Sequence, residues 1–255
     1  MSYSIQNLMS YLLVFARMGG MVGMNPIFAR RNVPIRVRAA FILALTMVMV
    51  PLVRDVPEES DTLSLLVLLV LEVTVGAVCG FIFQLFYYML FFAGDFMDLQ
   101  FGLSMARVFD PGTNIQASIS SNFINILFML YFFATNSHLV LIQAFSATFR
   151  LVPLGTAQIT GELSGFMISL FTSAFSLALR LALPFIAAEF VIEMAMGVLM
   201  KLIPQVHIFV INIQFKVLLG IFMLLAFSGP IANFLDYYMS VVLSSLERVI
   251  TILAR

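Results

Sequence analysis

The sequence predicts an all-α integral membrane protein built from long, partly broken helices and helical hairpins. Of its 255 residues, 62% are hydrophobic and only 10% are charged, whereas an ordinary soluble domain has about 25% charged residues. The run Leu63–Ala93 contains Glu72 as its only charged residue. A single span of hydrocarbon needs about 20 apolar residues, so this run is longer than one simple span requires.

Apolar segments of unequal length follow one another along the chain, and we expect each to form helix. Some are too short to cross a bilayer alone and two are much too long, which is typical of broken helices, re-entrant hairpins or helices stacked in a protein assembly. We find no internal repeat and no Gly/Ser linker, so residues 1–255 are predicted to form a single domain. The segments are Ile5–Met24, Ala39–Val53, Leu63–Ala93, Phe123–Ala134 with Leu139–Phe149, Leu163–Met200, Ile208–Phe227 and Ile231–Leu246.

Two short loops give the expected orientation. The first, ARRNVPIRVR, carries four arginines, whereas the second, RDVPEESD, is mainly acidic. Short basic loops remain on the cytoplasmic side of a membrane. We therefore expect the first loop inside and both the N-terminus and the acidic loop outside.

The composition and the absent motifs exclude several classes of protein. The 13 basic and 13 acidic residues balance, so nucleic acid is not an expected partner. Cys79 is the only cysteine, and His138 and His207 are far apart without neighbours at metal-ligand spacing. Phosphate loops, nucleophile elbows and zinc-protease motifs are all missing from the sequence. We predict that the chain is not an enzyme and binds no cofactor or metal.

Charged residues inside the apolar segments are the first candidates for function. A charge at the centre of a membrane helix costs about 2.5–3.5 kcal/mol on insertion scales, so each needs water or a partner. Glu189 and Glu193 share a helical face, while Arg180 lies on the opposite side and Pro184 is expected to kink the helix. The partners should come from other helices or chains. Assembly contacts are the favoured interpretation, and a polar conduit or proton relay is the alternative, for Arg17, Glu72, Arg180, Glu189 and Glu193.

Three pairs of glycines, each four residues apart, favour close helix packing. They are Gly19 with Gly23, Gly76 with Gly80, and Gly161 with Gly165. Small residues at this spacing let the backbones of membrane helices approach closely.

The segment Gly94–Asn122 differs in composition from the rest of the chain. It contains an Asp110-Pro111-Gly112 turn, in which Pro fixes φ and Gly permits positive φ. Thr113–Asn122 is too polar for lipid and too weakly patterned to predict a helix. The segment is either a linker or a loop inside a water-filled lumen.

Taken together, these residues resemble the FliR family of type III secretion export-gate subunits (FliR/SctT), over nearly the whole chain. The likeness rests on motifs at the start (Arg17, Pro26, Phe28, Pro34, Arg38, Pro51), in the middle (Glu72, Gly76, Gly80, Gly94, Asp98, Gln100, Gly102, Ser104, Asp110-Pro111, Asn136-Ser137-His138, Pro153) and near the end (LRLALP with Glu189, KLIPQVHIFVINIQFKV). In the last motif, Lys216 is retained, whereas His207, Asn212 and Gln214 depart from the common residues of that family.

The resemblance implies a place for the chain in the bacterial inner membrane, within the flagellum basal body. There the family assembles with FliP and FliQ into a closed pore for unfolded flagellar proteins, with FlhB attached, FlhA nearby and lipid around the assembly. It also implies that a loop of this chain plugs the pore. The residues assigned to this plug are Arg107, Phe109, Asp110, Pro111, Gly112, Asn114, Ser118, Ser120 and Asn122.

Two alternatives remain open at this point. A small-solute secondary transporter or channel could be built on the helix interrupted near Arg180 and Pro184. A scaffold without a pore would have the same composition, and its polar segment would be an ordinary linker.

Overall fold

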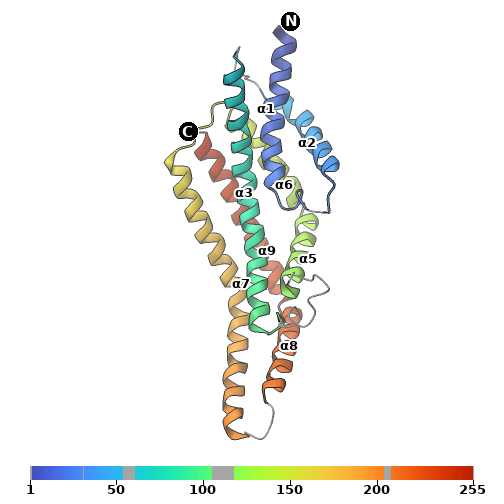
Figure 1. Cartoon of the computed structure of the whole chain (residues 1–255), viewed down its shortest axis with the longest axis vertical. Coiled ribbons are helices and arrows are strands. Elements are labelled where there is room, and N and C mark those ends of the chain that lie inside the picture. Colours follow the sequence, from blue (N-terminus) through green and yellow to red (C-terminus); the bar gives the residue numbers. More distant parts are fainter. Residues whose placement is uncertain (1, 31, 54–60, 105–117, 204–207, 255) are drawn as a thin grey trace. The chain divides into compact units, whose positions relative to one another are not determined.

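The computed structural model describes residues 2–30, 32–53, 61–104, 118–203 and 208–254 (Figure 1). Within these residues the chain is helical and contains no strand, which confirms the all-α prediction. The elements are α1 (Ser2–Met24), α2 (Ile35–Met49), the 3-10 turn η1 (Val50–Leu52), α3 (Thr62–Gln100), α5 (Ile119–Ala134), α6 (Ser137–Leu151), α7 (Gly161–Leu202), α8 (Ile208–Ala226) and α9 (Ser228–Leu253).

Two helices are far longer than a membrane is thick. α3 has 39 residues and α7 has 42, which at 1.5 Å per residue makes them about 58 Å and 63 Å long, roughly twice the hydrocarbon thickness. In the described part of the chain, three helices are long and apolar enough to cross a membrane. The number rises to five if two bent helix pairs, α5 with α6 and α8 with α9, each count as one span. These lengths confirm that the chain is not a row of simple spans.

α7 continues through Pro184 without an interruption. Proline lacks the N–H that would bond the carbonyl four residues earlier, which here is the carbonyl of Arg180. Membrane helices tolerate such a lost bond because neighbouring groups satisfy the carbonyl. The interruption on which the transporter alternative depended is therefore not present at this position.

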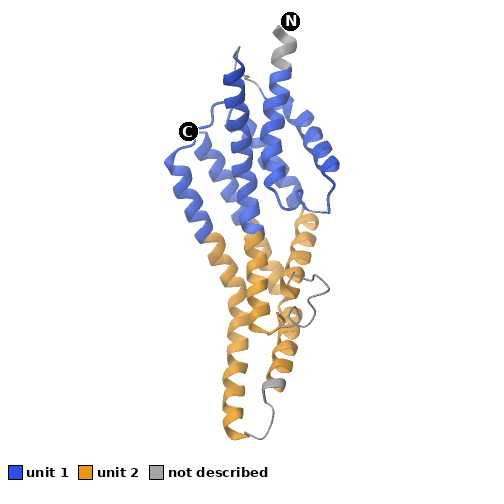
Figure 2. Ribbon diagram, viewed as in Figure 1, with its two compact units in different colours: residues 1–87, 136–172, 240–255 blue, residues 88–135, 173–239 orange. Residues whose placement is uncertain are grey.

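The chain divides into two compact units (Figure 2). The first unit comprises residues 1–87, 136–172 and 240–255, so it contains α1, α2, α6 and parts of α3, α7 and α9. Its core is formed by apolar side chains of these helices, among them Leu13, Met18, Met21, Ile82, Phe83, Leu141, Phe145 and Val249.

The second unit comprises residues 88–135 and 173–239, with α5, α8 and the remaining parts of α3, α7 and α9. Aromatic rings dominate its core. The Phe185 ring centroid lies 6.2 Å from that of Phe101 and 5.4 Å from that of Phe227. Gly220 of α8 faces Phe101 so closely that an added Cβ would lie 2.8 Å from the Phe101 ring, so glycine lets this ring pack directly on the α8 backbone.

Local signals explain two of the helix boundaries. Ser118 caps α5, because its Oγ accepts a hydrogen bond from the Ser121 N–H at 3.0 Å. α8 and α9 meet at a bend of 60°, where Phe227 is followed by Ser228, Gly229 and Pro230. The chain therefore changes direction between α8 and α9 without a long loop.

Large apolar side chains also remain exposed along several helices. On α3 they include Leu63, Leu66, Val67 and Val70, and on α8 they include Leu218, Phe222 and Leu225. A soluble monomer does not expose continuous apolar rows of this kind. These faces require lipid or protein around them.

Candidate functional site

Arg17 of α1 and Glu72 of α3 form a buried ion pair in the first unit. Both side chains are 0% exposed, and the Arg17 Nε donates to Glu72 Oε2. The other carboxylate oxygen of Glu72 accepts a hydrogen bond from the Gly155 N–H at 2.8 Å. Two of the charges that the sequence marked as needing partners thus satisfy each other.

The same arginine also binds the end of α6. Its Nη1 donates to the carbonyl oxygens of Thr148 at 3.0 Å and Val152 at 2.8 Å, and its guanidinium carbon lies 4.8 Å from the centre of the Phe149 ring. Carbonyl groups at the end of a helix carry partial negative charge. The Thr148 carbonyl also accepts the Val152 N–H at 2.9 Å, and a carbonyl oxygen has two lone pairs. Arg17 therefore connects α1, α3 and the C-terminus of α6 through one side chain.

Glycines allow α1 and α3 to approach closely around this ion pair. A Cβ added at Gly76 would overlap the Arg17 carbonyl, and one at Gly80 would lie 2.7 Å from the Met21 carbonyl oxygen. On the α1 side the close contact is made by Gly20, whose added Cβ would lie 2.7 Å from the Ala77 nitrogen. The α3 pair was predicted correctly. The predicted pair Gly19 and Gly23 has open space within 4 Å among the described residues, because Gly20 is the α1 glycine that faces α3.

A second group of charges joins α7 and α8 in the second unit. Lys216 Nζ lies 2.7 Å from Glu189 Oε1 and also pairs with Glu193 Oε2. Glu189 is buried, whereas Glu193 is 48% exposed. This confirms that the partner of the two glutamates comes from another helix. We call Glu189, Glu193 and Lys216 the α7–α8 charge cluster.

Asp98, near the end of α3, holds the beginning of α5. Its carboxylate accepts hydrogen bonds from the backbone N–H groups of Ile119 at 2.7 Å and Ser120 at 3.1 Å. Its backbone carbonyl accepts one from the Ser104 N–H at 3.3 Å. Gly94 touches the Ser121 backbone so closely that an added Cβ would overlap it. Asp98 thus supplies a second cap for α5 and contacts both ends of the segment between Ser104 and Ser118.

Replacing Asp98 with alanine should destabilise the second unit by about 1–3 kcal/mol, because one buried and one partly buried N–H group would lose their acceptor. Thermal unfolding of the purified chain in detergent measures this loss. Asp98→Asn keeps one acceptor oxygen and should retain part of the stability. An alanine variant that unfolds at the wild-type temperature would contradict the capping role.

The structure does not place all of the predicted site residues where the sequence suggested. Arg107, Phe109, Asp110, Pro111, Gly112 and Asn114 lie outside the described residues. Ser118, Ser120 and Asn122 belong to the cap and first turns of α5, so the expectation of irregular backbone up to Asn122 was wrong. Arg180 is exposed on α7.

Asp98 is part of the central motif in the sequence, but its role at the start of α5 was not predicted. The signal was present: Ser118 is a preferred N-cap residue, and a helix start whose amide groups need acceptors attracts a carboxylate. What the sequence did not show is that the carboxylate comes from another helix.

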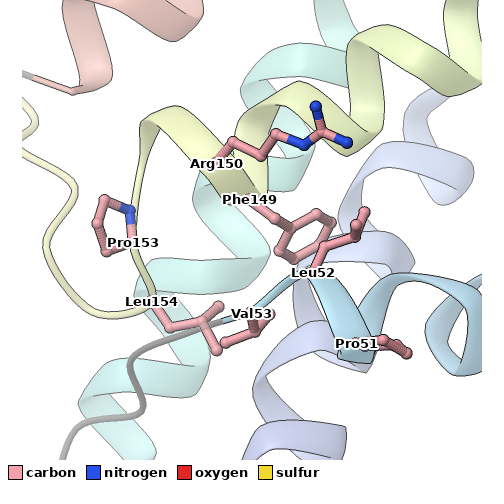
Figure 3. A pocket seen from close by; sticks show the side chains of 7 residues that line it. All are labelled: Pro51, Leu52, Val53, Phe149, Arg150, Pro153 and Leu154. Atoms are coloured by element: carbon pink, nitrogen blue, oxygen red, sulfur yellow. The ribbon is translucent and has the colours of Figure 1, made fainter.

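A cavity of about 460 Å³ opens in the first unit beside the end of α6 (Figure 3). Among the residues that line it, Arg150 carries the one charged side chain, which is exposed. In the described part of the chain, no group of three or more His, Cys, Asp or Glu residues could hold a metal ion. The cavity is lined by Pro51, Leu52, Val53, Phe149, Arg150, Pro153 and Leu154.

Helices of membrane length, apolar outer faces and charges paired between helices define an all-helical integral membrane protein. Residues 8–241 match the model of the family described as bacterial export proteins, family 1. The chain therefore belongs to this family of export proteins and is not an enzyme.

Individual relatives cover most of the chain. It is 29% identical over 243 residues to flagellar biosynthetic protein FliR of Escherichia coli (strain K12), covering 94% of this chain and 92% of the relative. The identity to FliR of Caulobacter vibrioides is 28% over 229 residues, covering 89% and 91%. FliR of Bacillus subtilis (strain 168) is 26% identical over 219 residues, covering 85% of each. The family expected from the sequence motifs is confirmed.

Proposed function

We propose that this chain is a subunit of the flagellar type III protein export gate in the bacterial inner membrane. In this role it forms, with FliP and FliQ, the closed pore through which unfolded flagellar proteins cross, with FlhB and FlhA as neighbours. The match to the export family and the FliR relatives supports the export role. The exposed apolar faces of α3 and α8 support a place among other membrane proteins.

The observation that carries the pore proposal is the arrangement around Asp98. Ser104 N–H bonds the Asp98 carbonyl, and the helix start after Ser118 bonds the Asp98 carboxylate. The described residues on the two sides of positions 105–117 thus meet at Asp98. This common anchor supports the proposal that the polar segment between them serves as the plug.

In the proposed mechanism this loop lies across the lumen when no substrate is present, and an entering substrate displaces it. Phe109 and Asp110-Pro111 fix the direction in which the loop leaves α3, with Arg107 at its start and Gly112 and Asn114 beyond the turn. Ser118 and Ser120 belong to its fixed base, because their helix start is held by Asp98.

Deleting Gly112–Gln116 tests the plug while keeping the Ser118 cap. We expect an increased ion conductance of the purified complex in a planar bilayer, because the lumen would lose its obstruction. The control replaces the same five residues with glycine and serine, which preserves the loop length and should leak less. Unchanged conductance in complexes that contain the deleted chain and assemble normally would contradict the plug.

A small-solute transporter remains the second candidate, and the α7–α8 charge cluster is the observation that favours it, since ionisable groups in membrane helices often mark ion or proton pathways. Purification from the native membrane separates the two candidates. A chain that is isolated alone, remains monodisperse and transports a solute would refute the export gate, whereas co-purification with two other small helical membrane proteins supports it.

A further inference from the structure

The α7–α8 charge cluster contains more negative than positive charge. Glu189 and Glu193 both converge on Lys216, so two carboxylates share one ammonium group. Arg180 and Lys201, the other cations described in the second unit, lie about 13 Å and 12 Å along α7 from the nearer glutamate. Neither distance permits an ion pair. Within the described part of the unit, the cluster therefore lacks one cation.

Asn212 of α8, beside the same charge cluster, has a buried acceptor atom without a hydrogen bond from any described residue. It lies one helical turn before Lys216, and its Oδ1 is buried and has no hydrogen-bond partner among the described residues. Buried polar atoms in native proteins are nearly always satisfied. The cluster thus lacks a hydrogen-bond donor as well as a positive charge, and a single basic side chain would supply both.

The surface around Glu193 indicates what kind of molecule would supply this basic side chain to the cluster. Glu193 lies at the edge of an exposed apolar stripe on α7 in which Phe190 is 61% and Met194 59% exposed. A water-facing surface would carry more polar residues, and a lipid-facing one would not carry a half-exposed carboxylate, given the cost of a charge in hydrocarbon. An apolar stripe with one carboxylate at its edge fits the face of an apolar helix that bears one cation.

We propose that this face of α7 binds a helix of a partner membrane protein that places one lysine or arginine against Glu193 and Asn212. The cluster then has two carboxylates and two cations, and the apolar stripe is covered by the rest of the partner helix. This inference rests on the proposed function, because it requires that the chain works within an assembly of membrane proteins.

The proposal predicts opposite effects of Glu193→Gln on the isolated chain and on the assembly. In the isolated chain the substitution removes the excess charge and leaves the Lys216–Glu189 pair intact, so the unfolding temperature in detergent should stay the same or rise. In the assembly it removes the partner of the incoming cation. The recovery of intact complex from the native membrane should fall at least tenfold.

The experiment compares tagged wild-type, Glu193→Gln, Glu193→Asp and Glu193→Lys chains, with Glu247→Gln as the control for an exposed carboxylate on another helix. Aspartate should assemble better than glutamine, lysine should be worst, and the control should match the wild type. A Glu193→Gln chain that assembles like the wild type, or that unfolds at a lower temperature when isolated, would overturn the inference. Both of these results leave the proposed function standing, whereas a wild-type chain recovered alone would overturn the two together.

Discussion

Replacing Arg17 with methionine is expected to destabilise the first unit by about 3–5 kcal/mol, which is the usual cost of removing one member of a buried ion pair. Methionine fills a similar volume, but among the described residues Glu72 would keep only the Gly155 N–H as a hydrogen-bond donor for its buried charge. The carbonyls of Thr148 and Val152 would also lose a donor. Thermal unfolding in detergent and the amount of chain in the membrane both measure this effect.

Two further variants distinguish the effect of losing this ion pair from the effect of losing any arginine. Arg180→Met removes an exposed arginine and should leave the unfolding temperature nearly unchanged. Changing Arg17 and Glu72 together to methionine should restore part of the stability, because no unpaired charge remains, although the Thr148 and Val152 carbonyls still lose the Arg17 donor. A single Arg17→Met variant as stable as Arg180→Met would show that the pair contributes little.

Replacing Gly76 with alanine should also be strongly destabilising, by about 1–3 kcal/mol or more. The added methyl group would overlap the Arg17 carbonyl, and since backbone atoms of a packed helix cannot move aside, α1 and α3 would have to separate. That separation would also stretch the Arg17–Glu72 pair. Equilibrium unfolding of the purified chain in detergent measures the change.

The matched controls are Gly19→Ala and Gly165→Ala. Each of these helical glycines has open space around its Cβ position within the described part of the chain, and alanine favours helix over glycine by up to about 1 kcal/mol. Both controls should therefore be neutral or slightly stabilising. If Gly76→Ala behaves like them, the contact between α1 and α3 is less close than the structure indicates.

Helix content and the need for charge partners could be read from the sequence, because hydrophobicity and the cost of buried charge depend on local composition. Which of these charges pair with each other could not be read from the sequence. Arg17 and Glu72 are 55 positions apart, and Lys216 reaches Glu189 from a different helix. Such pairing depends on how helices pack, which is a property of the whole fold.

The glycines and serines show where a local pattern misleads. Spacing identifies a possible face of a helix but not its rotation, so Gly19 and Gly23 were chosen where Gly20 makes the contact. Polarity likewise suggested a loop up to Asn122, yet α5 begins at Ile119. Ser118 Oγ accepts a hydrogen bond from the Ser121 N–H, and Ser121 Oγ donates one to the Phe91 carbonyl, so a polar stretch there is compatible with helix.

The lengths of α3 and α7 have a consequence for how the cell handles this protein. A helix about 60 Å long places roughly half its apolar surface outside the hydrocarbon of any bilayer. A newly made copy without neighbouring protein would expose that surface to water, where it invites aggregation and proteolysis. Synthesis of the chain must therefore be matched in time and amount to that of whatever covers α3 and α7.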